Sequence, residues 1–434
     1  MKNIVCKFGG TSLASTSQIL KVKDIVLSGK QKFIVLSAPG KRYKDDIKIT
    51  DILISIWNKA RLGQDYSNEF SFFIDRFNSI KQDLGVDIDL NAMYDALNQH
   101  LSTLCEYDYV ISRGEYFMAK IFAKHMGFNF LDAKDFIVFD KDANVDICSS
   151  QTRFNLLVKD NGRFVIPGFY GDYFGRVKTF SRGGSDITGA IVALLCKANI
   201  YQNYTDVDGF LCADPKICNS PRLIKKLSYS ELRELSYTGA NVLHTECVKF
   251  LRENNITLNL RNTFKSTCKG SLIMPDRKIQ HKHISGISGK DGYSLFVISS
   301  FGLSSSIGNY ILIEEIFNTY NINIEHLHSG IDTLSILVSA SLEKEIVQQI
   351  MSKLRSKFDQ VDFTPSVAIL SIVGKGLKNC KVEKKVLNAI YAINTQVYTL
   401  NKGSEGISLI FSIPKDDYES TITNLYHTLF EEKK

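Results

Sequence analysis

The first 275 residues alternate apolar, strand-like runs with amphipathic, helix-like runs, and this alternation restricts the chain to few folds. Segments 32–40 and 200–209 predict strands that end in turns, whereas segments 49–60 and 66–105 predict helices. Segment 163–186 begins as a strand and becomes a glycine-punctuated hairpin. Strands that alternate with helices form a mostly parallel sheet with helices on both faces. We therefore expect a three-layer α/β domain that binds its ligands at the carboxyl ends of the strands.

Two helices are predicted in more detail. Segment 109–127 indicates a strand, a tight turn at 112–115 and an amphipathic helix that ends at Gly127. Glu115 would then lie in the first turn of its helix. Segment 185–198 predicts a second helix, with Ser185 as its cap.

From residue 292 the pattern becomes a repeat. A strand at 293–302 precedes a helix at 307–321, two further strands and a second helix, and the same order returns from residue 366. Two copies of a βαββα unit indicate an internal repeat. The polar segment 276–291 contains glycines and is predicted to be a linker.

Composition excludes several classes of protein. The hydrophobic content of 44% and charged content of 23% are ordinary for a soluble globular chain. The net charge of +7 is mild and the lysines are spread out, so neither points to nucleic acid. No apolar run approaches the ~18 residues of a membrane span, and no signal-peptide core is evident. The nine cysteines are scattered without a C-x-x-C pair, which indicates reduced thiols in a cytoplasmic protein.

The stretch KFGGTS, residues 7–12, follows an apolar run at the start of the chain. Gly9 and Gly10 allow the backbone N–H groups to approach a ligand, and Lys7 adds a full positive charge beside them. Thr11 and Ser12 can cap a following helix, whose N-terminal amides attract anions. The stretch predicts a phosphate cradle, although an ordinary tight turn fits these six residues equally well. It is not a Walker P-loop, because its lysine precedes the glycines.

Three further turns combine glycine with charge: SRGE at 112–115, FSRGGSD at 180–186 and YTDVDG at 204–209. Each turn taken alone also fits an ordinary structural role, such as a carboxylate in the first turn of a helix or an Asx turn. Four such turns at one sheet edge indicate a ligand site. Arg182 suits a substrate carboxylate, and the helix that starts near Asp186 directs its positive end at the same place.

These motifs in this order, together with VLSAPGK and GANVLH, resemble aspartokinases (aspartate kinases), members of the amino acid kinase fold. The resemblance covers essentially the whole chain, because aspartokinases carry two ferredoxin-like ACT domains after the catalytic domain. It implies a catalytic domain at 1–275, a first ACT domain at 292–365 and a second at 366–434. Since the chain ends with the second repeat, it resembles the monofunctional enzymes and not those fused to homoserine dehydrogenase.

The resemblance also implies roles for individual residues. Catalytic roles fall on Lys7, Asp186 and Arg182. Aspartate would be surrounded by Ser37, Thr50, Glu115, Arg182 and Ser185. ATP would be bound by Lys7, Gly9, Gly10, Thr205, Asp206, Leu211, Lys216, Asn241 and Val242. Asn241 departs from the family, where a lysine is common. Mg²⁺ would accompany ATP, and no dedicated protein ligand for a metal is evident.

The implied reaction is the ATP-dependent phosphorylation of L-aspartate to 4-phospho-L-aspartate, the first step towards lysine, threonine and methionine. An inhibitory amino acid, with lysine favoured over threonine, is expected in the first repeat at Gly308, Glu325, Ser329 and Asp332. ACT domains pair edge to edge, so we expect a homodimer or a dimer of dimers.

Two alternatives stay open at this stage. One is a kinase of another small acid on the same fold, and the other is a catalytically weak regulatory subunit that binds amino acids.

Overall fold

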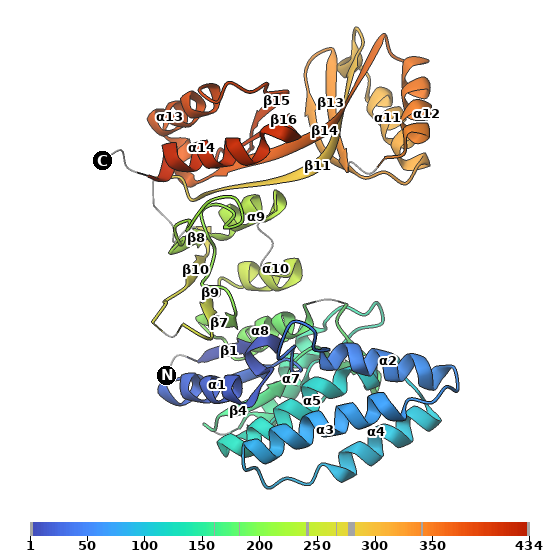
Figure 1. The fold of residues 1–434 in the computed structure, drawn as a ribbon, viewed down its shortest axis with the longest axis vertical. Coiled ribbons are helices and arrows are strands. Elements are labelled where there is room, and N and C mark those ends of the chain that lie inside the picture. The colour runs from blue at the N-terminus through green and yellow to red at the C-terminus, as the bar shows by residue number, and fades with distance from the viewer. Residues whose placement is uncertain are drawn as a thin grey trace. The chain divides into compact units, whose positions relative to one another are not determined.

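The computed structural model describes residues 3–159, 161–181, 183–239, 243–265, 267–276, 283–339 and 342–431, which fall into two compact units (Figure 1). The first unit comprises Met1–Phe210, Lys225–Tyr229 and Val242–Ile279. The second comprises Leu211–Ile224, Ser230–Asn241 and Gln280–Lys434. The domain boundaries expected from the sequence remain proposals.

An eight-stranded sheet forms the centre of the first unit, in the order β3-β4-β2-β1-β7-β9-β10-β8. All neighbouring strands are parallel except β9 and β10. The strands are β1 (Ile4–Phe8), β2 (Phe33–Leu36), β3 (Asn129–Phe130), β4 (Phe164–Pro167), β7 (Ile200–Thr205), β8 (Lys226–Ser228), β9 (Thr257–Asn262) and β10 (Ser271–Met274). The mostly parallel sheet predicted from the alternating pattern is confirmed. The predicted hairpin is also present, as the separate antiparallel pair β5 (Tyr170–Tyr173) and β6 (Arg176–Thr179).

Helices cover both faces of this sheet and make the three layers. One face meets α1 (Thr16–Ser28) and a lobe of α2 (Ile49–Arg61), α3 (Ser67–Asp83), α4 (Asn91–Thr103) and α5 (Tyr107–Met126). The other carries α7 (Ile147–Leu157), α8 (Gly184–Leu195) and α10 (Thr245–Glu253), while the short α6 (Ala133–Phe136) packs on α7 and β5. Cys6 and Phe8 of β1 belong to the core beneath the lobe. Because successive strand residues point to opposite faces, Lys7 points to the α8 face.

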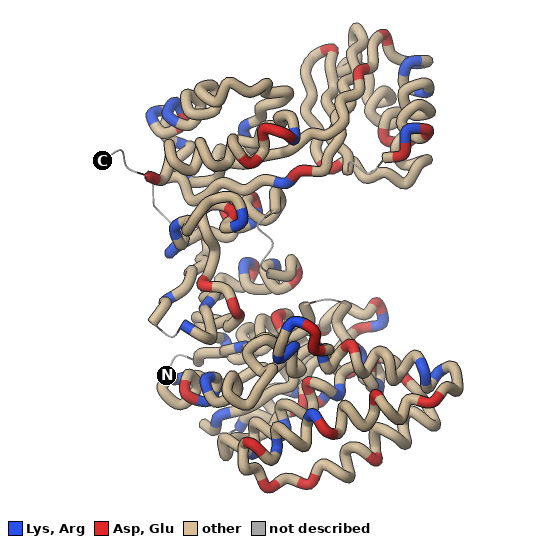
Figure 2. The backbone as a smooth tube through the Cα atoms, in the orientation of Figure 1, with Lys and Arg blue, Asp and Glu red and all other residues tan. Residues whose placement is uncertain are grey.

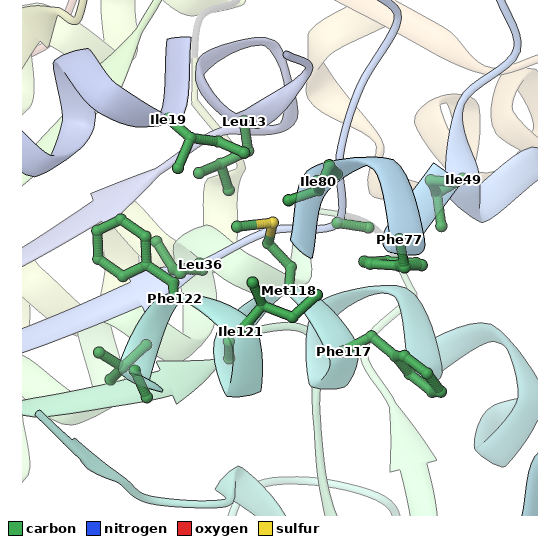
Figure 3. Close-up of a cluster of buried hydrophobic side chains, with 14 of the residues drawn as sticks. Leu13, Ile19, Leu36, Ile49, Phe77, Ile80, Phe117, Met118, Ile121 and Phe122 are labelled. Atoms are coloured by element: carbon green, nitrogen blue, oxygen red, sulfur yellow. The ribbon is translucent and has the colours of Figure 1, made fainter. Parts of the chain in front are cut away.

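The core between the lobe and the sheet is built from large apolar side chains (Figure 3). Ile19 of α1, Leu36 of β2 and Ile49 of α2 belong to it, as do Phe77 and Ile80 of α3 and four residues of α5, namely Phe117, Met118, Ile121 and Phe122. All but Ile80, at 3% exposed, are fully buried. This packing fixes the lobe against the strands whose ends form the site.

Two local predictions in this unit are wrong. Segment 109–127 contains no strand or turn, because Tyr107–Met126 is one continuous helix, α5. Gly114 lies inside that helix because its backbone is close-packed, and a Cβ there would lie 2.8 Å from Ala38 Cβ. Glu115 is therefore a mid-helix residue and does not open a helix.

The helix ends also differ from prediction. Gly183, in the left-handed conformation with φ 62°, is the N-cap of α8, so Ser185 lies inside the helix. Thr11 and Ser12 belong to a 3₁₀ turn, η1 (Gly10–Leu13), and the next helix begins only at Thr16, after Ser15.

A six-stranded antiparallel sheet, in the order β12-β13-β11-β14-β16-β15, forms the second unit. The strands are β11 (Gly286–Ser299), β12 (Ile324–Ser329), β13 (Thr333–Ser339), β14 (Gln360–Val373), β15 (Thr399–Lys402) and β16 (Ser408–Pro414). The helices α11 (Ile307–Thr319), α12 (Lys344–Arg355), α13 (Cys380–Tyr391) and α14 (Tyr418–Phe430) complete two βαββα copies, as the sequence predicts. Helix α9 (Tyr229–Tyr237) falls mostly in this unit.

The two repeats share one sheet through their long strands β11 and β14. The first half of β11, Gly286–Lys290, pairs with Ile369–Val373, whereas Leu295–Ser299 pairs with Gln360–Thr364. The register shifts between these halves, next to Gly292 with φ 90°. Part of the predicted linker 276–291 is therefore strand. This part of the strand has no alternating pattern in the sequence, because Gly286, Ile287 and Ser288 are all buried. Residues 277–282 lie outside the described residues.

Charges of both signs are interspersed along the chain (Figure 2). Of the helices in the described ranges, none has the length and apolar character that a membrane crossing requires.

Candidate active site

A cavity of about 550 Å³ lies where β1 and β2 end, a volume typical of small-molecule sites. Its lining comes from the turns after these strands, the start of α2, the middle of α5 and the start of α8. Of the residues given catalytic, substrate-binding or nucleotide-binding roles from the sequence, seven line it: Lys7, Gly10, Ser37, Thr50, Glu115, Ser185 and Asp186. The structure thus brings together turns that are far apart in the sequence.

An ion pair between Lys7 and Asp186 lies in this cavity. Lys7 Nζ is 2.6 Å from Asp186 Oδ1, and both side chains are largely buried. The same carboxylate oxygen accepts a hydrogen bond of 2.9 Å from Asn203 Nδ2. Asn203 lies directly beside Lys7 in the parallel pair β1–β7. The carboxylate therefore orients the ammonium, which keeps further N–H donors for an anion.

The glycine turn lies against this ammonium. Gly9 N–H donates to Tyr204 O at 3.1 Å, and a Cβ on Gly9 would lie 3.5 Å from Lys7 Nζ. Gly10 packs against the turn after β2, where Gly40 N–H donates to Gly10 O at 2.9 Å. A Cβ on Gly40 would lie only 2.8 Å from Gly10 C. The two turns approach backbone to backbone, which side chains at these positions would prevent.

Glu115 is the second carboxylate of the cavity and has a different environment. It is 5% exposed, and its Oε2 has no hydrogen-bond partner among the described residues. Burial raises the pKa of this carboxyl to about 8, because desolvation outweighs backbone hydrogen bonds and the charges of Arg113 and Lys7. The cavity thus holds an ion pair and an acid that is mostly protonated at neutral pH. A cation brought by a ligand would favour ionisation of Glu115.

The N-terminus of α8 lies at the cavity. Gly183, Gly184, Ser185 and Asp186 all line it. A Cβ on Gly183 would lie 2.6 Å from the Cβ of His244, so this cap must be a glycine for space as well as for its φ of 62°. The N-terminus of a helix attracts anions, and Asp186 lies in its first turn.

Some predicted residues lie outside the cavity lining. Thr205 ends β7, and its Oγ1 donates to the exposed Asp206. Leu211 and Lys216 belong to the second unit. Arg182, Asn241 and Val242 lie outside the described residues. The nucleotide roles given to these residues remain predictions.

Asn203 was missed by the sequence reasoning. A parallel strand buried on both faces normally consists of apolar residues, and Asn203 in IYQNYT breaks that rule. This polar residue in a buried strand was the available signal. Lys41, which closes the motif VLSAPGK, and Lys48 also line the cavity, although no role was predicted for either.

The predicted effector residues divide into two places within the first repeat. Asp332 accepts a hydrogen bond of 2.8 Å from Gly302 N–H, which joins the β12–β13 hairpin to the turn before α11. Ser329 ends β12 on this side, and Gly308 lies in the first turn of α11. Glu325 lies at the other end of β12, about 13 Å from Ser329 at ~3.3 Å per residue. Its backbone oxygen accepts from Tyr237 Oη of α9.

Comparisons with known proteins extend over the whole chain. The model of the amino acid kinase family matches residues 2–262. Aspartokinase 3 of Bacillus subtilis (strain 168) is 29% identical, with 98% of each chain covered. The crystal structure of the aspartate kinase of Clostridium acetobutylicum superposes with a TM-score of 0.92 at 35% identity, covering 99% of this chain and 100% of that one.

A more distant solved structure shares the fold. Aspartokinase III of E. coli, crystallised in complex with lysine and aspartate, superposes with a TM-score of 0.77 at 20% identity. The alignment covers 99% of this chain and all of that one.

Proposed function

This chain belongs to the amino acid kinase family, as one of its aspartokinases, and on that premise we propose how its cavity phosphorylates L-aspartate with ATP. The β-carboxylate oxygen of aspartate attacks the γ-phosphorus of ATP, the bond to the ADP oxygen breaks, and 4-phospho-L-aspartate and ADP result. The observation that carries this proposal is the Lys7–Asp186 ion pair beside the glycine turn, at the end of a parallel sheet. The product would be the first intermediate towards lysine, threonine and methionine.

The acceptor needs no general base, because a carboxylate is already ionised at neutral pH. Catalysis then depends on alignment and on stabilising the negative charge of the transferring group. Lys7 and the amide of Gly10 would bind phosphate oxygens, and the start of α8 adds its positive end. Mg²⁺, held mainly by the phosphates of ATP, would neutralise further charge.

Aspartate would occupy the part of the cavity near Glu115. The ionised Glu115 would accept a hydrogen bond from the substrate ammonium, and Ser37, Thr50 and Ser185 offer hydroxyls around it. Arg182 would bind the α-carboxylate in a bidentate manner. This arrangement selects an amino acid with two carboxylates, because one is held while the other attacks.

ADP formation with a set of acids tests this assignment against the alternatives. Aspartate should support turnover with MgATP, and glutamate or N-acetylglutamate should support little. A preference for one of these other acids would favour another kinase of the same fold. Absence of turnover with every acid, together with stabilisation by lysine, would favour a regulatory subunit.

We also propose that lysine inhibits the enzyme by binding at the end of the first repeat where Gly302, Ser329 and Asp332 meet. The carboxylate of Asp332 would bind a cationic side chain, and the start of α11 near Gly308 offers amides for the α-carboxylate. The E. coli structure of the same fold contains lysine, which makes lysine the first effector to test. Inhibition requires lysine to prefer an inactive state of the enzyme.

Asp332→Ala should abolish inhibition by millimolar lysine while leaving catalysis unchanged. Asp359→Ala is the matched control. Asp359 directly precedes β14 and accepts hydrogen bonds from Ser300 Oγ and Phe301 N–H at the same turn. Equal inhibition curves for the wild type and Asp332→Ala would disprove this site. A wild type that responds to threonine and not to lysine would disprove the effector.

We further propose that two copies associate through the first repeat. Strand β12 is an outer strand of the described sheet, and Phe301, Ile307 and Ile331 are 94%, 79% and 81% exposed. Ile331→Asp should lower the mass measured by light scattering, whereas Tyr391→Asp in the second repeat should not. An unchanged mass for Ile331→Asp would contradict this interface.

A cytoplasmic location is proposed as well. All nine cysteines lie in described ranges and are unpaired, which is typical of a reducing compartment.

A further inference from the structure

Arg76 of α3 reaches from the helical lobe towards the cavity without lining it. The residue is 5% exposed. Its Nη2 donates to Ala14 O at 2.6 Å and to Gly40 O at 3.1 Å, and its Nη1 lies 3.3 Å from Asp46 Oδ2. One guanidinium therefore contacts the chain after β1, the turn after β2 and the loop that follows that turn.

Asp46 makes the loop part of the same cluster. It is 3% exposed and accepts three hydrogen bonds from Arg42: from N–H at 2.9 Å, from Nε at 2.8 Å and from Nη2 at 3.0 Å. These hydrogen bonds lower the pKa of the Asp46 carboxyl despite its burial. The loop from Lys41 to Lys48 is thereby closed on a buried carboxylate that also binds Arg76.

The three segments that this cluster joins form one wall of the cavity. Gly10 and Thr11 come from the first segment, Ala38, Pro39 and Gly40 from the second, and Lys41, Lys48 and Thr50 from the loop and the helix start that follows it. The first of these segments faces the phosphates in the proposed reaction, whereas Thr50 faces aspartate.

We propose that Arg76, acting with Asp46, is a positioning residue for phosphoryl transfer. The pair sets the distance between the phosphate-binding turn and the aspartate-binding loop. The inference rests on the proposed function and adds residues that do not touch either substrate. Its physical basis is that no other side chain can replace the planar fork of an arginine at three acceptors on three segments. Misplacement of reacting groups by about 1 Å can cost ~100-fold in rate.

The main test is Arg76→Lys, with Arg163→Lys as the matched control. Arg163 also binds two backbone oxygens, Val26 O at 3.1 Å and Gly29 O at 3.0 Å, at the opposite ends of the strands and away from the cavity. Turnover and both KM values are measured with aspartate and MgATP, at a temperature where circular dichroism shows each variant to be folded. We expect Arg76→Lys to lose at least tenfold in kcat. Arg163→Lys should keep the kcat of the wild type, even if its Tm falls as much as that of Arg76→Lys.

A double-mutant cycle with Asp46→Asn distinguishes positioning from general destabilisation. If Arg76 and Asp46 act as one unit, the double variant should lose no more kcat than the worse single variant. The proposal is overturned by a kcat within twofold of wild type for Arg76→Lys, by equal losses in Arg76→Lys and Arg163→Lys, or by additive losses in the cycle. An inactive wild type would refute the proposed function instead, so the two failures are distinguishable.

Discussion

Raising the pH from 6 to 8 should tighten the binding of aspartate, and Glu115 is the reason. Its carboxyl has a pKa of about 8, because burial disfavours the charged form. Binding the substrate ammonium requires that carboxyl to be ionised. Aspartate therefore has to displace a proton from Glu115 at any pH below 8, and the displacement weakens its binding.

The size of the effect follows from the fraction of protein with Glu115 ionised. With a pKa of about 8, this fraction is about one half at pH 8, one-tenth at pH 7 and one-hundredth at pH 6. Because the apparent dissociation constant is the intrinsic one divided by the competent fraction, it should fall about tenfold from pH 6 to 7 and about fivefold from pH 7 to 8. About 0.9 proton should be released per aspartate bound at pH 7.

Isothermal titration calorimetry across this range, in buffers with different ionisation enthalpies, measures both quantities. Glu115→Gln is the control, because a neutral amide of the same shape should bind aspartate weakly and without pH dependence. A flat profile for the wild type would refute the reasoning. An equally steep profile for Glu115→Gln would also refute it, because another group would then carry the dependence.

The same raised pKa has a consequence for folding. Between pH 4.5, the ordinary pKa of this carboxyl, and about pH 8, Glu115 is protonated in the native state but ionised in the unfolded chain. Stability of the ligand-free protein should therefore fall as pH rises through this window, and Glu115→Gln should reduce that fall.

Further substitutions separate catalysis, binding and stability. Lys7→Ala should lower kcat about 100-fold or more while aspartate still binds in calorimetry, and near-normal turnover would remove Lys7 from the mechanism. Arg182→Ala should raise KM for aspartate steeply with little change in KM for ATP, and the reverse pattern would contradict its assignment. Asn203→Leu removes a hydrogen-bond partner of Asp186, together with an Oδ1 that has no hydrogen bond to any described residue. We expect kcat to fall about tenfold while Tm, followed by circular dichroism, stays equal or rises, and a large loss of Tm would contradict this account.

Much of the fold followed from periodicity. The alternating pattern predicted the parallel sheet and its helices, and the repeat predicted both βαββα copies. The meeting of the turns at Gly9 and Ser37 was predictable because parallel strands place their carboxyl ends at one edge, whereas the turn at Gly184 follows the separate hairpin β5–β6.

Other features depend on tertiary contacts that a local pattern does not contain. Segment 109–127 was given a strand and a turn because Gly114 marks turns in sequence, whereas here it allows a helix to touch Ala38. Ser185 is a good cap by residue type, but the N-cap is Gly183 in the αL conformation, so the helix begins at Gly184. Arg76 shares a helix face with Phe73, Phe77 and Ile80 in the sequence, and only its three acceptors reveal a role.

The most direct test of the account is the identity of the phosphorylated carboxylate. The enzyme is incubated with aspartate and MgATP, the acyl phosphate is reduced with borohydride, and the amino alcohol is identified by mass spectrometry against standards. Phosphorylation of the β-carboxylate predicts homoserine from the wild type, and Lys7→Ala predicts almost none. Formation of 3-amino-4-hydroxybutanoate, which reports the α-carboxylate, or no aspartate-dependent product from the wild type, would contradict the account.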